Sequence, residues 1–470
     1  MEKYKKLIGN SLVFAIGNFG SKAINILMVP LYTFFMTPGE YGVVDLFNTT
    51  ISLFLPIITI SISEAVIRFT LDKINEEKSV NKVLSNAIFI NVISILICTL
   101  LYPVLSYFEL FEGYLFMFIL LLSLNQLEAT YTQFTRAIGK IKQFAINGLV
   151  MTLLTACFNI IFLVYMSLGT NGFLLSLILS NSISIIYLYF VTNSFERVKI
   201  RLIDFKLIKY MIKYSIPLIP NMIMWWLINS STRYFILFFV DATANGIFAV
   251  ANKIPTILSM FTSIFQQAWQ LSVFEEFKNN DKDKFYSQVF KIYYKLLFTL
   301  SALIIPFLHI IVPIIIDDSF IESWQIIPIL LVAVIYQSFS SFVGTIYTAS
   351  MNTKGIFISS IIGGLISVLL NFILVPYYGL TGAGFSSALS FVCMFVIRYY
   401  DTKKDIKLNI DFRFFIFNNI MILLQIVLIR VIGGATILFV VNILIFFILL
   451  VFNCLSEKKG IIKLKKIIRK

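Results

Sequence analysis

The sequence has few charged side chains and few residues that bind metals or form disulfides. Only 13% of the 470 residues are charged, whereas an ordinary soluble domain has about 25%. There is one histidine, His309, and the four cysteines have no CxxC spacing among them. No GxxxxGK[ST] phosphate-binding loop is present either. We therefore expect no metal, no disulfide framework, no cofactor and no ATP hydrolysis. The composition excludes a soluble enzyme, a disordered chain and a nucleic-acid-binding domain.

The sequence does contain long apolar runs. Hydrophobic residues make up 59% of the chain and its mean hydropathy is +0.90. A run of about 20 apolar residues can cross a bilayer as a helix, and about fourteen runs qualify. They cover residues 9–36, 41–69, 83–107, 113–138, 144–167, 172–193, 210–240, 243–272, 287–312, 323–350, 356–377, 380–400, 412–432 and 436–455. The predicted fold class is an all-α polytopic membrane protein.

The basic residues predict the orientation of these helices. Lys and Arg number 38 against 24 Asp and Glu, a net charge of +14. With both termini in the cytoplasm, all but Lys22, Arg233, Lys253 and Arg430 fall in or beside inner segments, and the outer turns hold none. This is the distribution that the positive-inside rule requires. The apolar run after the basic start is too long for a signal-peptide core, so we expect it to be the first helix.

The two halves of the chain repeat each other weakly. Asn159, Gly169, Gly172, Ser176 and Ser180 match Asn371, Gly379, Gly382, Ser386 and Ser390 in the same order. We predict an N-terminal six-helix bundle over 1–205 and a second over 206–404. Two further helices and a basic tail occupy 405–470. Since an even number of helices gives both copies the same orientation, this is the pattern of a two-bundle alternating-access transporter.

Several predicted helices carry polar stripes. They hold Asn18, Lys22 and Asn25; Asp45 and Asn48; Glu128 and Arg136; Trp225, Asn229 and Arg233; and Asn252, Lys253, Gln266 and Gln270. A single amide or hydroxyl is commonly a contact between packed helices. A cation inside the membrane costs about 2.5–3.5 kcal/mol, so Lys22, Arg233 and Lys253 are candidate functional residues. The alternative is an internal ion pair with Asp45, Glu64, Glu128 or Asp241. A wet, cationic cleft suits an anionic head group such as a diphosphate.

Three segments resemble a known family: GNSLVFAIGNFGSKAINILMVPLYTFFMTPGEYGVVDLFNTT (9–50), KYSIPLIPNMIMWW (213–226) and NGIFAVANKIPTI (245–257). They are similar to polysaccharide-biosynthesis flippases of the Wzx type, whose superfamily includes multidrug and toxin extruders and the lipid II flippase. The resemblance implies two six-helix bundles in a V-shaped arrangement in the bacterial cytoplasmic membrane. It implies transfer of an undecaprenyl diphosphate-linked repeat unit for O-antigen or capsule. Membrane lipids, a polysaccharide polymerase and chain-length machinery are the partners that go with that role.

The resemblance also suggests roles for the polar residues. The diphosphate would be held by Lys22, Arg233 and Lys253. The sugars would be bound by Asn18, Asn25, Asn48, Asn229, Asn252, Gln266 and Gln270, with Trp225 stacking on a sugar face. Arg68 and Arg136 lie toward the cytoplasmic mouth. Coupling to H⁺ or Na⁺ would use Asp45, Glu64, Glu128 or Asp241, each of which could equally be a structural counter-ion.

The sequence is also compatible in outline with three other functions, each of which fits it less well. A multidrug exporter of the same superfamily is the main alternative, but it favours an acidic, aromatic cavity rather than three cations. A membrane polymerase or ligase needs a sizeable outer loop, and the longest outer turn, around Asp317 and Asp318, is short. A symporter of the major facilitator type is disfavoured because loop 72–82 lacks that family's Gly/Asp/Arg pattern.

Overall fold

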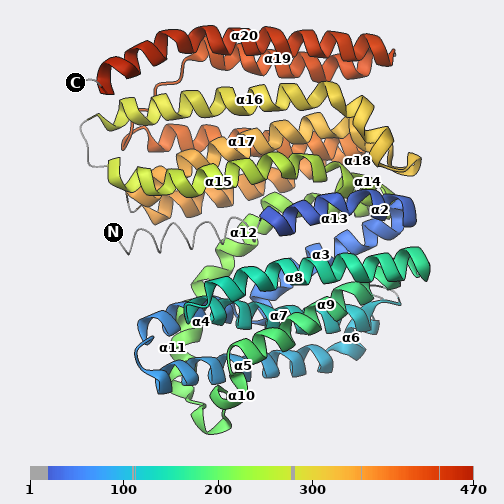
Figure 1. The fold of residues 1–470 in the computed structure, drawn as a ribbon, viewed down its shortest axis with the longest axis vertical. Helices are drawn as coiled ribbons and strands as arrows, with labels where there is room; N and C mark the ends of the chain where they lie inside the picture. The colour runs from blue at the N-terminus through green and yellow to red at the C-terminus, as the bar shows by residue number, and fades with distance from the viewer. Residues whose placement is uncertain are drawn as a thin grey trace. The chain divides into compact units, whose positions relative to one another are not determined.

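The computed structural model describes residues 19–107, 111, 113–276, 281–350, 352–432 and 434–468 (Figure 1). In these ranges every regular element is a helix and no strand occurs. The predicted all-α fold class is therefore confirmed. The chain divides into two compact units, Met1–Trp226 and Leu227–Lys470. The predicted division into 1–205, 206–404 and 405–470 stays a prediction.

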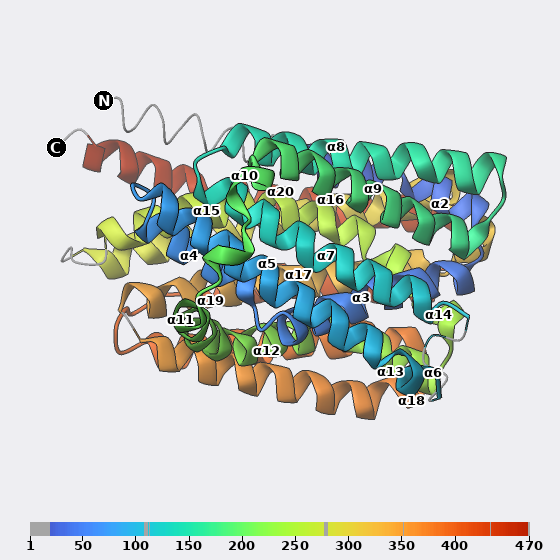
Figure 2. The same cartoon turned by 90° about the horizontal axis from the view of Figure 1, so that it is seen from below.

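The first unit begins with a helical stretch, Phe19–Phe35, that includes α2 (Val29–Phe35). Its other elements are α3 (Pro38–Ile58), α4 (Ile62–Asp72), α5 (Glu77–Leu100), α6 (Tyr102–Tyr107), α7 (Leu115–Ala137), α8 (Ile141–Asn159), η1 (Ile160–Tyr165), α9 (Gly169–Val191), α10 (Ser194–Arg197), η2 (Ile200–Leu202), α11 (Phe205–Ser215), η3 (Ile216–Leu218) and the start of α12 (Ile219–Ser230). Figure 2 shows α7, α8 and α9 side by side, and these three helices pack on one another.

The second unit is built around two long helices, α16 and α17. Its elements are α13 (Thr232–Phe239), α14 (Ala242–Ala251), α15 (Lys253–Glu276), α16 (Lys282–Ile315), η4 (Asp318–Phe320), α17 (Ser323–Ala349), α18 (Thr353–Thr402), α19 (Phe412–Val431) and α20 (Ala435–Ile468). Helix α16 packs against α17, α19 and α20. The core between them is rich in aromatic side chains, among them Phe290, whose ring packs edge-on against Phe339 and tilted against Phe342.

Among the described residues, ten helices are long and apolar enough to cross a membrane, or eleven if the bent pair α14–α15 forms one span. Helix α18 counts once in that number although it contains a break at Gly379, whose φ of 52° and ψ of −131° are not helical. Glycine suits this backbone because it has no Cβ. The sequence predicts two helices, 356–377 and 380–400, that meet at this turn. The total of about fourteen stays a prediction.

Three predicted spans differ in detail from the structure. Span 41–69 is broken between α3 and α4, where Ile60 and Ser61 have positive φ. Span 210–240 is divided among α11, η3, α12 and α13. Pro56 lies just before the first break and Pro217 lies in the second, as expected of a residue without an N–H. Helix α20 also continues beyond residue 455 to Ile468, into the predicted basic tail.

Equivalent residues of the repeat make equivalent contacts within each unit. Asn159 donates from Nδ2 to the Tyr32 hydroxyl at 3.1 Å, and Asn371 donates from Nδ2 to the Thr232 hydroxyl at 3.1 Å. Both asparagines are fully buried. Gly169 and Gly379 have matching φ values of 51° and 52°. The weak sequence repeat therefore corresponds to a repeated local structure.

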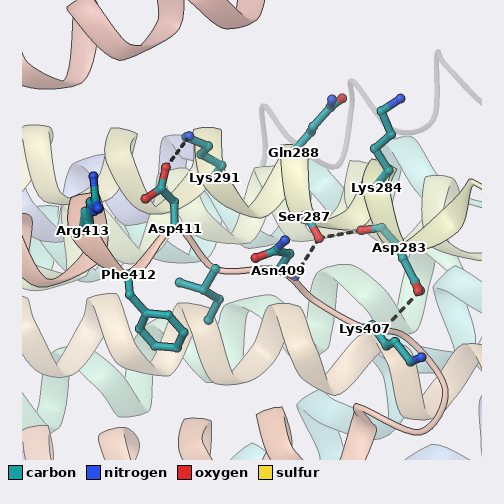
Figure 3. A pocket seen from close by; sticks show the side chains of 11 residues that line it. Asp283, Lys284, Ser287, Gln288, Lys291, Lys407, Asn409, Asp411, Phe412 and Arg413 are labelled. Atoms are coloured by element: carbon teal, nitrogen blue, oxygen red, sulfur yellow. Dashed lines mark hydrogen bonds and ion pairs between the residues drawn. The ribbon is translucent and has the colours of Figure 1, made fainter.

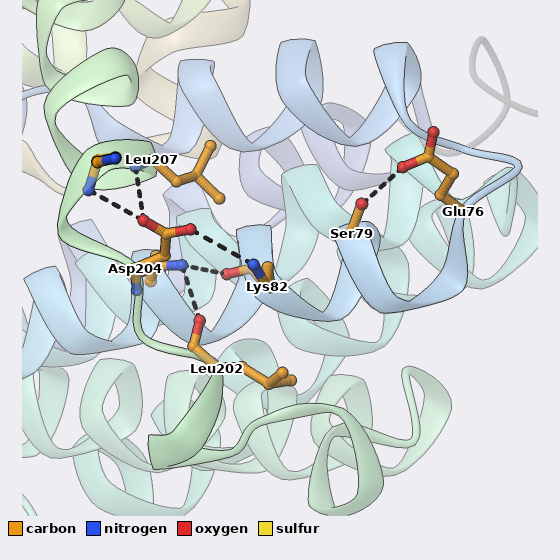
Figure 4. Close-up of polar contacts among 8 residues, drawn as sticks. Glu76, Ser79, Lys82, Leu202, Asp204 and Leu207 are labelled. Atoms are coloured by element: carbon orange, nitrogen blue, oxygen red, sulfur yellow. Dashed lines mark hydrogen bonds and ion pairs between the residues drawn. The ribbon is translucent and has the colours of Figure 1, made fainter.

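The segment that leads out of the first six predicted helices is fastened to α5 (Figure 4). The buried Asn86 accepts a hydrogen bond at Oδ1 from the Asp204 backbone N–H, at 2.8 Å, and donates from Nδ2 to the Leu202 carbonyl at 3.3 Å. Asp204 forms an ion pair with Lys82 at 3.4 Å. The Leu207 N–H, assisted by Lys82, holds the pKa of the Asp204 carboxyl below its ordinary value. These contacts fix where α11 begins.

Replacing Asn86 by Ala should loosen this segment. The change leaves the Asp204 N–H and the Leu202 carbonyl without their partner, which costs about 1–3 kcal/mol. We expect a lower unfolding temperature in detergent and faster trypsin cleavage after Lys199 and Arg201. Ser79→Ala, which removes only a surface hydrogen bond to Glu76 on the same helix, is the control. Equal cleavage of the Asn86→Ala variant and the wild type would contradict this role for Asn86.

Candidate functional site

A polar face runs along the first helices of the first unit. Lys22 and Asn25 are exposed on the stretch before α2, and Asn48 and Ser52 are exposed on α3. Within the described residues, Asn48 donates to the Val44 carbonyl of its own helix and its side-chain oxygen accepts no hydrogen bond, so that oxygen can accept from a ligand. Asn18 lies outside the described residues. Lipid tails cannot hydrogen-bond, so exposed amides and ammonium groups on membrane helices indicate contact with water.

Buried apolar side chains next to this polar face hold α3 in place. Tyr41, Val44, Phe47 and Ile51 are buried there. The helix starts with a capping box in which Thr37 and Glu40 satisfy each other's backbone N–H groups. On α12, Trp226 donates from Nε1 to the Thr49 carbonyl at 2.9 Å. Trp225, the predicted sugar-stacking residue, is half-buried beside it in the sequence.

The second unit has its own polar cluster, on α12, α13 and α17. Arg233 is half-buried and donates from Nη1 to the Asn229 carbonyl at 3.3 Å. The exposed Asn229 accepts from Gln337 Nε2 at 2.8 Å. The carbonyl of the following residue, Ser338, accepts from Gln266 Nε2 at 3.4 Å. The structure thus brings Asn229 and Arg233 together and adds Gln337 to them.

Asn252 and Lys253 lie where α14 and α15 meet at an angle of 41°. Asn252 donates from Nδ2 to the Phe248 carbonyl at 2.7 Å, and Lys253 is half-buried at the first residue of α15. The break leaves this ammonium group beside irregular backbone rather than in the middle of a continuous helix. Gln270 is exposed further along α15.

The four candidate coupling carboxylates lie in different surroundings. Glu128 on α7 accepts hydrogen bonds at Oε1 from Thr132 at 2.7 Å and from Asn147 at 3.3 Å. Asn147 in turn accepts from Ser184 at 2.9 Å. Within the described ranges Glu128 makes no ion pair. Asp241 caps α14 by accepting from the Ala244 N–H at 2.7 Å. Asp45 and Glu64 are half-buried on α3 and α4.

The two arginines predicted near the cytoplasmic mouth are both exposed. Arg68 forms an ion pair with Asp72 at 3.4 Å, one helical turn away, and Arg136 lies in the last turn of α7. Arg430 donates from Nη2 to the Thr381 hydroxyl at 2.7 Å. The single histidine, His309, packs edge-on against Trp324 with ring centroids 5.0 Å apart.

Sequence reasoning missed two buried cations of the second unit. Arg398 is 2% exposed and donates to the Ser359 hydroxyl, the Ser360 hydroxyl and the Ser340 carbonyl, each at 3.0 Å. Lys295 is 3% exposed and its Nζ lies 4.8 Å from the centroid of the Phe414 ring. The positive-inside distribution counts both of them among the cations of inner segments. No local sequence signal marks either side chain as buried.

The fold is shared with transporters of known structure. The lipid II flippase MurJ in an inward-closed conformation superposes with a TM-score of 0.71 at 16% identity, covering 96% of this chain and 100% of that chain. An inward-facing multidrug resistance transporter of the MATE family superposes with a TM-score of 0.67 at 12% identity, covering 82% of this chain and 95% of that chain. A MOP superfamily transporter from Pyrococcus furiosus superposes with a TM-score of 0.56 at 12% identity, covering 85% of this chain and 96% of that chain. The binding pocket of that transporter is described as having reverse polarity. At these identities the likeness concerns the fold.

A sequence comparison with curated proteins gives no significant match. The model of the family described as "Polysaccharide biosynthesis protein" matches residues 7–270. The match covers more than half of the chain and includes the helices that carry Lys22, Asn48, Arg233 and Lys253. The protein therefore belongs to the polysaccharide biosynthesis protein family and has the fold of the MOP superfamily transporters.

Proposed function

We propose that this protein is a flippase that moves a polyprenyl diphosphate-linked oligosaccharide from the inner to the outer leaflet of the bacterial cytoplasmic membrane. The product would supply a surface polysaccharide such as O-antigen or capsule. The observation that carries the proposal is the set of exposed amide and cationic side chains on otherwise apolar helices, with Lys22 and Asn48 in one unit and Asn229 in the other. The family and the resemblance of the fold to a lipid II flippase support the class of substrate.

The residue types suit the two parts of such a head group. Lys22 and Lys253 offer mobile ammonium groups and Arg233 a fixed fork, all of which donate to phosphate oxygens. The amides of Asn25, Asn48, Asn229, Asn252, Gln266 and Gln270, with Asn18, can donate to and accept from sugar hydroxyls. Trp225 supplies an aromatic face. The exposed Arg68 and Arg136 would guide the diphosphate from the cytoplasm, where we place both termini.

The energy source in this proposal is an H⁺ or Na⁺ gradient, and Glu128 is the best placed of the four carboxylates. It accepts hydrogen bonds only from neutral groups within the described ranges, so a proton or a cation can neutralise it. Asp241 is committed to a helix cap. Asp45 and Glu64 remain further candidates. A polysaccharide polymerase and chain-length machinery would take up the transferred unit.

The test is transport by the purified protein in sealed vesicles. A short polyprenyl diphosphate oligosaccharide is placed in the bilayer, and a glycan-modifying enzyme added outside reports arrival at the outer face. We expect protein-dependent transfer that is faster with an imposed ion gradient. The same vesicles are given a fluorescent organic cation, which should not be moved. Export of the cation without transfer of several glycans would instead identify a multidrug exporter.

A further inference from the structure

A basic pocket lies in the second unit, at the ends of two predicted membrane helices, and none of its lining residues belongs to the polar clusters described above (Figure 3). It is formed by the first turns of α16, the connection from α18 to α19, and the first turn of α19. Its volume is about 690 Å³. Four cations line it, Lys284, Lys291, Lys407 and Arg413, together with the carboxylates Asp283 and Asp411.

Both carboxylates already have partners within the pocket. Asp411 forms an ion pair with Lys291 at 2.9 Å. Asp283 accepts from the Lys407 backbone N–H at 3.0 Å, and Ser287 accepts from the Asn409 backbone N–H at 2.8 Å. These bonds hold the connecting segment against α16, which fixes the two walls of the pocket relative to each other. The shape of the pocket is therefore fixed by specific hydrogen bonds and an ion pair.

Three of the four lining cations can interact with a ligand. Lys284, Lys407 and Arg413 are exposed and form no ion pair with any residue that the structure describes. The lining carries four positive and two negative charges. Two ammonium groups and a guanidinium around one cavity match the oxygens of a phosphate group, which accept charge-assisted hydrogen bonds from both. The chemistry favours a phosphate ester.

The position of the pocket points to the source of that phosphate. Helices α16 and α19 are both long and apolar enough to cross a membrane, and the pocket lies at their ends, so we expect it at head-group level. From the pocket, Phe412, Ile416 and Ile420 follow one another at intervals of four along α19, and each is more than half exposed. Basic side chains therefore surround the first turn of α19 and exposed apolar side chains follow along its length, which suits a phospholipid with its head group in the pocket and its chains in the bilayer.

We propose that this basic pocket binds the head group of an anionic phospholipid, such as phosphatidylglycerol, from the cytoplasmic leaflet. The lipid head group lies in the pocket that Lys284, Lys407 and Arg413 line, and an acyl chain lies along Phe412, Ile416 and Ile420. The bound lipid would brace α19 against α16, where Lys291 and Lys295 already flank the Phe414 ring at 5.0 and 4.8 Å. The inference does not depend on the substrate that the protein transports.

The test measures lipid bound to the full-length protein. Protein freed of lipid in uncharged detergent is titrated with phosphatidylglycerol or with phosphatidylcholine of the same chains, and retained lipid is counted by native mass spectrometry. We expect selective retention of phosphatidylglycerol that falls at least tenfold in a Lys284→Gln, Lys407→Gln, Arg413→Gln variant. The Lys291–Asp411 pair stays intact in that variant. A control with Lys78, Lys142 and Lys209 changed to Gln removes three exposed cations elsewhere and should bind like the wild type.

Three results would overturn the proposal. Equal retention of the two lipids, or unchanged retention in the pocket variant, would show that the pocket is not selective for an anionic head group. Displacement of the lipid by millimolar inorganic phosphate would instead indicate a site for a free anion. If the triple variant does not fold, the Lys284→Gln, Lys407→Gln pair makes the same comparison, because both side chains are exposed and neither forms an ion pair within the described ranges.

Discussion

Changing Lys22 and Lys253 together to Ala should reduce transfer of a lipid-linked oligosaccharide at least 100-fold. Hydrogen bonds that involve a charged group contribute about 1.5–3 kcal/mol each. Loss of two such interactions with a diphosphate therefore amounts to about 3 kcal/mol or more, and each 1.4 kcal/mol is about tenfold. Lys22 is exposed on its helix and Lys253 lies at a break between helices, so neither change creates a cavity in a packed core.

The measurement is the initial rate of glycan arrival in the vesicle assay, with equal amounts of inserted protein. Lys22→Arg with Lys253→Arg keeps both charges and should restore at least a third of the rate. Lys142→Ala with Lys209→Ala removes two exposed cations outside the proposed site and should leave the rate unchanged. If the Lys22, Lys253 double Ala variant transports at the wild-type rate, the diphosphate is bound by other residues.

Changing Arg398 to Ala should destabilise the second unit more than any other single change considered. The guanidinium is almost fully buried and makes three hydrogen bonds. Two go to Ser359 and Ser360, in the part of α18 before the break at Gly379, and one goes to the Ser340 carbonyl on α17. Its removal leaves the Ser340 carbonyl without that partner and opens a cavity, for which we expect about 3 kcal/mol. For a unit of this size that is a fall in unfolding temperature of roughly 6–12 °C.

Thermal unfolding in detergent, followed by tryptophan fluorescence, measures this effect. Arg430→Ala is the matched control, since Arg430 is an exposed arginine with a hydrogen bond to Thr381 and should cost less than about 1 kcal/mol. Arg398→Lys keeps the charge, but an ammonium group lacks the planar guanidinium geometry that reaches three acceptors. We therefore expect its loss of stability to lie between those of Arg398→Ala and Arg430→Ala. A melting temperature for Arg398→Ala within about 2 °C of the wild type would show that the buried arginine does not hold α18 to α17.

Local signals explain which parts of the fold were predictable. Long apolar runs identified nearly all of the long helices, and the turn at Gly379 was placed correctly because glycine is needed where the backbone leaves the helix. The apolar runs alone do not locate the breaks at Ile60–Ser61 and within 210–240. Proline lies near both, but proline is tolerated inside many membrane helices, so its presence does not determine where a helix ends.

The candidate site was predictable in residue type and less so in arrangement. The stripe through Asn229 and Arg233 follows from helical periodicity, and the structure brings these two residues together. Their partner Gln337 is more than a hundred residues away in the sequence. Arg398 and Lys295 lie close to charged segments in the sequence, and no local pattern distinguishes them from cations at the membrane surface.

The sequence by itself therefore determined that this protein is helical and membrane-embedded, that its halves repeat, and which family it resembles. These properties depend on hydrophobicity and periodicity, which act over a few helical turns. Only the tertiary structure decided which cations are buried and which are exposed, and it alone assembled the basic pocket from Lys284 on α16 and Arg413 on α19. The physical reason is that the environment of a charged side chain is set by the helices packed around it, and those come from distant parts of the chain.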